Sequence, residues 1–259
     1  MKLGSVTLVG AGPGDPELLT IKAAKAIARA TLLLVDDLVS DAIVALASPG
    51  ARVVHVGKRG GCRSTPQAFI EKLMLTAARD GEVVVRLKGG DPFLFGRGGE
   101  ELEHLRAEGI DVSVINGISA GFAAASALGV ALTHRDHAQG VVFVTGHTQR
   151  GGTATNWRAL ARTAHDTGLT LVVYMGVSGV QHLQQELLSG LPGDTPVALV
   201  QSASLPEQRM FVTRLQQLAD TVAREKVASP AIMVIGNVAR AAALASDAMQ
   251  MPGARATAA

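Results

Sequence analysis

Short, continuous runs of apolar residues alternate along the chain with longer stretches in which apolar residues recur at helical spacing. Such runs predict strands that are buried on both faces, as in a parallel sheet. The predicted strands are Ser5–Gly10, Thr31–Val35, Arg52–Val56, Val83–Leu87, Val112–Ile115, Val141–Thr145, Leu171–Met175, Pro196–Val200, Met210–Thr213 and Ala231–Ile235. Strands that alternate with helices indicate βαβ units and an α/β fold with mostly parallel or mixed sheets.

All of these strands in a single sheet would make an unusually large one, so two five-stranded α/β domains are the simpler prediction. We expect an N-terminal domain over residues 1–116, a C-terminal domain over residues 117–246 and a disordered tail over residues 247–259. Helices are expected at Pro16–Arg29, Gln67–Arg79, Gly121–Leu128, Trp157–Ala164, Val180–Leu188 and Arg214–Glu225.

The composition is typical of a globular protein. Of the 259 residues, 47% are hydrophobic and 18% are charged, which favours a large core over a disordered chain. The net charge of +2 gives no reason to expect nucleic acid or an acidic membrane as a partner. The single cysteine (Cys62), the absence of a signal-peptide pattern and the absence of a long apolar run favour a cytoplasmic location.

The first glycine-rich segment, Val9–Pro16, follows the first predicted strand. A glycine-rich turn at the carboxyl end of a strand is where open α/β sheets bind ligands. The acids Asp36 and Asp37 after the second strand add to the likeness to a dinucleotide fold. However, the glycines at 10, 12 and 14 lack the G-x-G-x-x-G spacing, and Pro13 lacks an N–H for a pyrophosphate. A nicotinamide-dependent oxidoreductase is therefore disfavoured, and a purely structural turn remains open.

The second segment, RLKGGDPFLFGRGGEE over Arg86–Glu101, carries five glycines between a strand and a helix. It has no Walker pattern for phosphate. Exposed backbone and a carboxylate suit a neutral or cationic ligand with hydroxyl groups, because Asp91 can accept hydrogen bonds from a hydroxyl or an amino group. The alternative is an Asp-Pro turn without a ligand.

The strings GAGPGDPELLT, LVS, VGKRGG, VVRLKGGDPFLFGRGGEE, THRDHAQ, TGH and VVYMG together resemble the uroporphyrinogen-III C-methyltransferases. These are tetrapyrrole methylases, which are class III S-adenosylmethionine-dependent methyltransferases. The resemblance runs from about Val6 to Arg240. It implies two α/β domains, S-adenosylmethionine bound in the cleft between them, S-adenosylhomocysteine as a product, no metal and a homodimer.

The resemblance also implies a reaction. Uroporphyrinogen III would be methylated at carbons 2 and 7, giving precorrin-2 by way of precorrin-1, for the synthesis of sirohaem, cobalamin or haem d1. The family's cofactor contacts fall on Pro13, Gly89, Gly90, Asp91, Leu94, Ser119, Ala120, Met175, Ala203 and Ala231. Many of these would be backbone contacts, which fits the small residues.

The catalytic residues implied by the resemblance are Asp36, Lys58 and Arg97. Asp36 stands at the family's proton acceptor and Lys58 at its proton donor. Asp37 replaces the family's arginine and places two carboxylates side by side. A surface salt bridge between Asp36 and Lys58 is the alternative interpretation.

The implied substrate carries eight carboxylates, and Lys58–Arg97 contains eight Lys or Arg residues against four acids. Because arginine binds carboxylates bidentately, arginines are the expected substrate contacts. The predicted substrate-binding residues are Arg59, Arg63, Arg97, Glu100, His134 and Arg135. His134, His137 and His147 do not have the spacing of a zinc site, so no metal is expected.

Two other functions remain open. A tetrapyrrole methylase acting later in corrin synthesis is one, although the VGKRGG and THRD strings argue against it. A non-catalytic, S-adenosylmethionine-binding regulatory protein is the other, and Asp37 is its main support. The chain starts at the methylase segment, so we expect it to lack the dehydrogenase–chelatase part of multifunctional sirohaem synthases.

Overall fold

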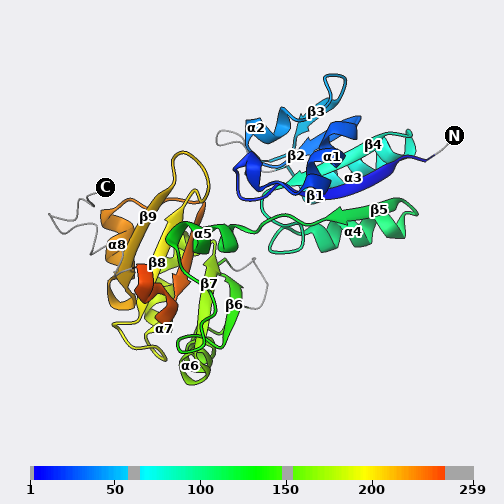
Figure 1. The fold of residues 1–259 in the computed structure, drawn as a ribbon. Helices are drawn as coiled ribbons and strands as arrows, with labels where there is room; N and C mark the ends of the chain where they lie inside the picture. Colours follow the sequence, from blue (N-terminus) through cyan, green and yellow to red (C-terminus); the bar gives the residue numbers. More distant parts are fainter. Residues whose placement is uncertain (1–2, 58–64, 148–153, 243–259) are drawn as a thin grey trace, which may run out of the picture. The chain divides into compact units, whose positions relative to one another are not determined.

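The computed structural model describes residues 3–57, 65–147 and 154–242 of the chain. It divides into unit 1, Met1–Ala120, and unit 2, Gly121–Ala259, which are described separately (Figure 1). The sequence placed the join at residues 116–117, whereas the units separate just after the first residue of the next helix. The expected tail, 247–259, lies outside the described residues.

Unit 1 contains a five-stranded sheet in which every strand is parallel to its neighbours, in the order β3-β2-β4-β1-β5. Its elements are β1 (Ser5–Gly10), η1 (Pro16–Leu18), α1 (Ile21–Arg29), β2 (Leu32–Val35), α2 (Asp41–Val44), β3 (Arg52–His55), α3 (Gln67–Arg79), β4 (Val83–Lys88), α4 (Gly98–Ala107) and β5 (Asp111–Ile115). The central strand, β4, pairs with β1 and β2, so residues at its end are surrounded by protein.

The strands of unit 1 bury apolar side chains on both faces. One layer, which includes Leu34 and Val84, packs against α3 and α4. The other, which includes Val85, packs against α1 and α2. Because successive strand residues point to opposite faces, Arg86 and Lys88 share the face of Val84 and point toward α3 and α4.

Unit 2 contains a mixed five-stranded sheet in the order β6-β7-β10-β8-β9. Its elements are α5 (Ala120–Leu128), β6 (Gly140–Thr145), α6 (Trp157–Thr167), β7 (Leu169–Tyr174), η2 (Val177–Gly179), α7 (Val180–Leu187), β8 (Pro196–Gln201), β9 (Arg209–Arg214), η3 (Leu215–Gln217), α8 (Leu218–Arg224), β10 (Ala231–Ile235) and η4 (Asn237–Ala239). β6 and β7 are parallel, whereas β10 is antiparallel to β7 and β8.

One face of the unit 2 sheet packs against α6, α7 and α8, with Trp157 in the apolar cluster. α5 packs on the other face, where the Gly121 N–H donates to the Tyr174 hydroxyl at 2.8 Å. A Cβ atom on Gly121 would lie 2.5 Å from that hydroxyl, so only glycine allows this approach. The small residues of α5 thus serve close helix–sheet packing inside unit 2.

The α/β fold with two five-stranded sheets is confirmed. All of the predicted strands are present, and their ends shift by at most two residues. The helix predicted over Pro16–Arg29 is divided, because Thr20 caps a new helix by accepting a hydrogen bond from the Ala23 N–H at 3.1 Å. Among the described residues, no helix is both long and apolar enough to cross a membrane.

Candidate active site

The carboxyl end of the unit 1 sheet gathers most of the residues that the sequence singled out. Because all five strands are parallel, the loops that follow them leave the sheet at the same end. Pro13 follows β1, Asp36 follows β2, Gly89, Gly90, Asp91 and Leu94 follow β4, and Ser119 and Ala120 follow β5. Open α/β sheets bind their ligands at this position.

Glycines bring the ends of β1, β4 and β5 into direct backbone contact. A Cβ atom on Gly117 would lie 2.2 Å from the Gly90 carbonyl oxygen, and one on Gly10 would lie 2.4 Å from the Gly117 nitrogen. The Gly90 N–H donates to the Gly12 oxygen at 2.7 Å, and the Gly12 N–H donates back at 3.1 Å. These glycines therefore permit a close backbone junction that a side chain on Gly10 or Gly117 would block.

Asp91 uses its carboxylate to fix the second glycine-rich loop. Its Oδ1 accepts a hydrogen bond from the Phe93 N–H at 2.8 Å, and its Oδ2 accepts from Asn116 Nδ2 at 3.2 Å and from the Gly117 N–H at 3.1 Å. The loop after β4 is thereby tied to the turn after β5. A carboxylate has about four acceptor positions, so Asp91 can hold the loop and still accept from one ligand group.

Arg97 precedes α4 in a left-handed conformation, with φ of 58°. Its Nε and Nη2 donate to the two carboxylate oxygens of Glu100 at 3.1 and 2.6 Å. This bond, before any other cause, raises the pKa of Arg97 and lowers the pKa of Glu100. Both side chains remain about half exposed, so Glu100 orients a guanidinium that solvent and a ligand can reach.

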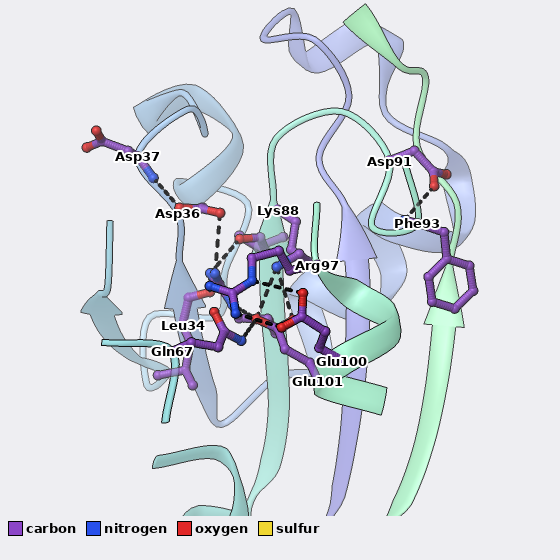
Figure 2. A network of polar contacts seen from close by, with 12 residues as sticks. Leu34, Asp36, Asp37, Gln67, Lys88, Asp91, Phe93, Arg97, Glu100 and Glu101 are labelled. Atoms are coloured by element: carbon purple, nitrogen blue, oxygen red, sulfur yellow. Dashed lines mark hydrogen bonds and ion pairs between the residues drawn. The ribbon is translucent and has the colours of Figure 1, made fainter. Parts of the chain in front are cut away.

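A buried group of charges lies between β4 and the helices α3 and α4 (Figure 2). Glu101 is fully buried and accepts hydrogen bonds from Lys88 Nζ at 3.1 and 3.0 Å and from Arg86 Nε at 3.3 Å. Gln67 Nε2 donates to the same carboxylate at 3.1 Å. We call these four residues the Glu101 cluster. Burial, followed by the charge of Arg86, lowers the pKa of Lys88, and Glu101 acts in the opposite direction.

Asp36 connects the Glu101 cluster to the surface. Its Oδ2 accepts from Arg86 Nη2 at 3.3 Å and its Oδ1 accepts from the Asp37 N–H at 3.0 Å. The Asp36 side chain is 36% exposed, whereas that of Arg86 is 3% exposed. Figure 2 shows the Asp37 carboxylate pointing away from Asp36, so the two adjacent acids do not form a facing pair of carboxylates.

The structure corrects the count of basic residues that the sequence related to a polyacid substrate. Arg86 and Lys88 entered that count, but both side chains are buried and bonded to Glu101. Arg79, the last residue of α3, forms an exposed ion pair at 2.7 Å with Glu108, which follows α4. The predicted arginine contacts are Arg59, Arg63, Arg97 and Arg135. Arg97 lies in the described part of unit 1 and Arg135 in that of unit 2. Arg59 and Arg63, like Lys58, lie outside the described residues.

Three further predicted residues lie together at one end of the unit 2 sheet. Met175 follows β7, Ala203 follows β8, and Ala231 begins β10, which runs antiparallel to both strands. Met175 is 44% exposed with φ of 54°, whereas Ala203 and Ala231 are buried. The sequence thus selected residues that share an end of the sheet, although it did not predict the direction of β10.

His134 and Arg135 lie in the turn before β6, also in unit 2. The His134 ring stacks on His137 with centroids 4.5 Å apart, and its Nδ1 accepts from the Asp136 N–H at 3.1 Å. Arg135 is exposed. In the part of the chain that the structure describes, no group of three His, Cys, Asp or Glu residues could hold a metal ion.

Exposed apolar side chains at the carboxyl end of the unit 1 sheet were not anticipated. Leu38, Phe93 and Phe95 are 59%, 52% and 38% exposed, on the loops after β2 and β4. A Cβ atom on Gly89 would lie 2.8 Å from Leu38 Cβ, so Leu38 stands directly against the glycine loop. The signal in the sequence was large apolar residues inside otherwise polar, glycine-rich loops.

The chain matches the family of Tetrapyrrole (Corrin/Porphyrin) Methylases over residues 5–219. It is 53% identical, over 92% of its length and 95% of the relative, to a uroporphyrinogen-III C-methyltransferase of Pseudomonas aeruginosa. It is 48% identical to siroheme synthase 2 of Aeromonas hydrophila, over 92% of this chain but 49% of that protein.

A solved structure of uroporphyrin-III C-methyltransferase from Thermus thermophilus, complexed with S-adenosylhomocysteine, is similar to this chain. The TM-score is 0.78 and the identity is 40%, over 92% of this chain and 99% of the other. A match of this extent, together with the family match over most of the chain, establishes the family. The chain belongs to the tetrapyrrole (corrin/porphyrin) methylases.

Proposed function

We propose that the chain is an S-adenosylmethionine-dependent enzyme that C-methylates uroporphyrinogen III. The main support is its similarity to the Pseudomonas aeruginosa enzyme over nearly the full length of both chains. The products would be precorrin-1 and then precorrin-2, methylated at carbons 2 and 7. The siroheme synthases are about twice as long as the matched segment, and their other activities are not carried over to this chain.

The residues at the carboxyl end of the unit 1 sheet fit the cofactor. S-adenosylmethionine would supply a methyl group on a positively charged sulfur. Gly10, Gly90 and Gly117 bring the strand ends close together, and Asp91 can accept a hydrogen bond while it holds its loop. The proposed contacts are Pro13, Gly89, Gly90, Asp91, Leu94, Ser119 and Ala120 from unit 1, with Met175, Ala203 and Ala231 from unit 2.

Asp36 is the proposed proton acceptor. Attack of a pyrrole carbon on the methyl group requires alignment more than a strong base, but a proton must leave the substrate afterwards. The Asp36 carboxylate is held on one side by Arg86 and remains partly exposed, so an oxygen can accept that proton. Lys58 remains the proposed donor by resemblance.

The proposed substrate surface combines charge with apolar contact. A tetrapyrrole has an apolar ring bordered by carboxylates, and the exposed Leu38, Phe93 and Phe95 suit the ring. Arg97, oriented by Glu100, suits a carboxylate. Arg59, Arg63, His134 and Arg135 are further proposed substrate contacts.

We expect Arg97→Ala to raise the KM for uroporphyrinogen III about 10-fold, the usual size of one charge-assisted hydrogen bond. Steady-state kinetics at saturating S-adenosylmethionine measures this change. Arg106→Ala is the matched control, because Arg106 is an exposed arginine near the other end of the same helix. Equal kinetics for wild type and Arg97→Ala would remove Arg97 from the substrate surface.

The cofactor is tested by ligand-induced stabilisation. Saturating S-adenosylhomocysteine should raise the midpoint of thermal unfolding, because a ligand that binds the folded state stabilises it by mass action. NAD should leave the midpoint unchanged, since the first loop lacks the dinucleotide spacing. A shift with NAD and none with S-adenosylhomocysteine would reverse the cofactor assignment. Binding of S-adenosylhomocysteine without turnover would favour the regulatory alternative.

We also propose a homodimer in the cytoplasm, as the family resemblance and the single cysteine imply. Light scattering coupled to size-exclusion chromatography measures the mass directly. Twice the mass of 26.7 kDa is the expected value, and a mass equal to that of one chain would contradict the proposal.

A further inference from the structure

We propose that Arg86 is a positioning residue for the methyl-transfer reaction: it holds the Asp36 carboxylate in place, and Glu101 holds Arg86. This inference rests on the proposed function, because it concerns the group that would accept the substrate proton. It assigns a role to a buried set of charges that neither cofactor nor substrate binding explains.

The burial of these charges calls for a reason. The Arg86 and Lys88 side chains are each 3% exposed and Glu101 is not exposed at all. Buried ion pairs are commonly no more stabilising than well-packed apolar residues of similar volume. Arg86 and Lys88 lie on the same buried face of β4 as Val84, where apolar side chains would be expected. Stability alone is therefore a weak explanation for the cluster.

The hydrogen bonds of Arg86 link the buried Glu101 to the partly exposed Asp36. Its Nε donates to Glu101 and its Nη2 donates to Asp36, each at 3.3 Å. Its Nη1 donates to the backbone oxygens of Leu34 and Leu87 at 3.4 and 3.1 Å. A planar guanidinium held at three of its nitrogens cannot rotate without breaking several bonds. The donor that reaches Asp36 is consequently fixed relative to β2 and β4.

Asp36 is then held at both oxygens. Arg86 occupies one position on Oδ2 and the Asp37 N–H occupies one position on Oδ1. Each oxygen retains a further lone pair, and the side chain is 36% exposed. The geometry of these two bonds therefore selects the orientation in which Asp36 presents its remaining lone pairs.

The net charge of the Glu101 cluster is +1, and the Asp36 carboxylate neutralises it. Arg86 and Lys88 carry two positive charges and Glu101 carries one negative charge, all of them buried. The fourth charge is the Asp36 carboxylate, which is the most exposed of the four charged groups. Lys88 thus acts as the second cation on Glu101 and leaves Arg86 available to bridge the two acids.

A double-mutant cycle on turnover tests this role. Arg86→Lys keeps the charge but loses the fork that reaches both acids, and should lower kcat at least about 10-fold with both KM values nearly unchanged. Asp36→Asn should lower kcat at least about 100-fold. If Arg86 acts through Asp36, adding Arg86→Lys to Asp36→Asn should change kcat less than about 2-fold. Arg79→Lys, in an exposed ion pair of the same unit, is the control and should keep wild-type kinetics.

The outcomes separate this inference from the proposed function. Suppose that the wild type turns over and that the reductions in kcat caused by Arg86→Lys and Asp36→Asn multiply in the double variant. This result would overturn the positioning role of Arg86 but not the proposed function. A normal kcat in Arg86→Lys would do the same. No wild-type turnover would overturn the proposed function and the inference with it. If Arg86→Lys does not fold, the charge-balanced Arg86→Gln/Glu101→Gln pair replaces it, with the same expected loss of kcat. Failure of that pair to fold as well would assign the cluster to stability and reject the inference.

Discussion

Glu101→Gln is expected to lower the free energy of unfolding by about 3–5 kcal/mol, the usual cost of removing one partner from a buried ion pair. The substitution preserves shape but removes the negative charge that Arg86 and Lys88 share. Chemical denaturation followed by far-ultraviolet circular dichroism measures the change. Glu100→Gln is the matched control, because Glu100 is the neighbouring residue but is 58% exposed in its pair with Arg97. The control should cost less than about 1 kcal/mol.

The same substitution should make stability depend on pH. Burial already lowers the pKa of Lys88 from its usual 10.5, and loss of Glu101 removes the contacts that oppose this shift. The unfolded chain keeps the lysine proton to higher pH than the folded variant, so the unfolded state binds more protons. Stability of Glu101→Gln should therefore recover as pH rises through the alkaline range toward 10.5, the usual pKa of lysine. A loss that stays constant over this range would contradict the assignment of the cost to an unpaired Lys88.

Gly117→Ala is expected to destabilise unit 1 by about 3 kcal/mol or more, the upper range for forcing an extra carbon into a packed interior. The added Cβ would lie 2.2 Å from the Gly90 oxygen and 2.8 Å from Gly10, and these neighbours are backbone atoms that cannot rotate away. Binding of S-adenosylhomocysteine should be lost with the junction. Denaturation and calorimetric titration together measure both effects.

Gly99→Ala is the matched control for the glycine junction. Gly99 belongs to the glycine-rich segment Arg86–Glu101, as does Gly90 of the junction, but a Cβ atom on Gly99 would meet nothing within 4 Å. It lies in the first turn of α4, where alanine should be neutral or stabilising by up to about 1 kcal/mol. Equal stability of Gly117→Ala and Gly99→Ala would show that the strand ends do not approach as closely as described.

The periodicity of the sequence was sufficient for the strands and the fold class, because strands buried on both faces give uninterrupted apolar runs. It did not give the direction of β10, since an apolar run such as Ala231–Ile235 reads the same in a parallel or an antiparallel strand. The division of Pro16–Arg29 was also missed, because it depends on the cap formed by Thr20.

The glycine-rich loops identified the end of the sheet at which the candidate site lies, but not what each charge does there. Arg86 and Lys88 were counted with the basic residues, although their spacing of two already placed them on the face of Val84. Their burial depends on Glu101, which approaches from α4 only in the folded chain. An ion pair between a strand and a helix, such as the one between β4 and α4, leaves no local pattern in the sequence.

The central claim is that the chain transfers methyl groups from S-adenosylmethionine to uroporphyrinogen III. The most direct measurement is mass spectrometry of the tetrapyrrole after anaerobic incubation of the folded protein with both compounds. The expected product is heavier by one and then by two methylene units, with one S-adenosylhomocysteine formed for each methyl group transferred. An unchanged tetrapyrrole mass, obtained with protein that binds S-adenosylhomocysteine, would contradict this claim.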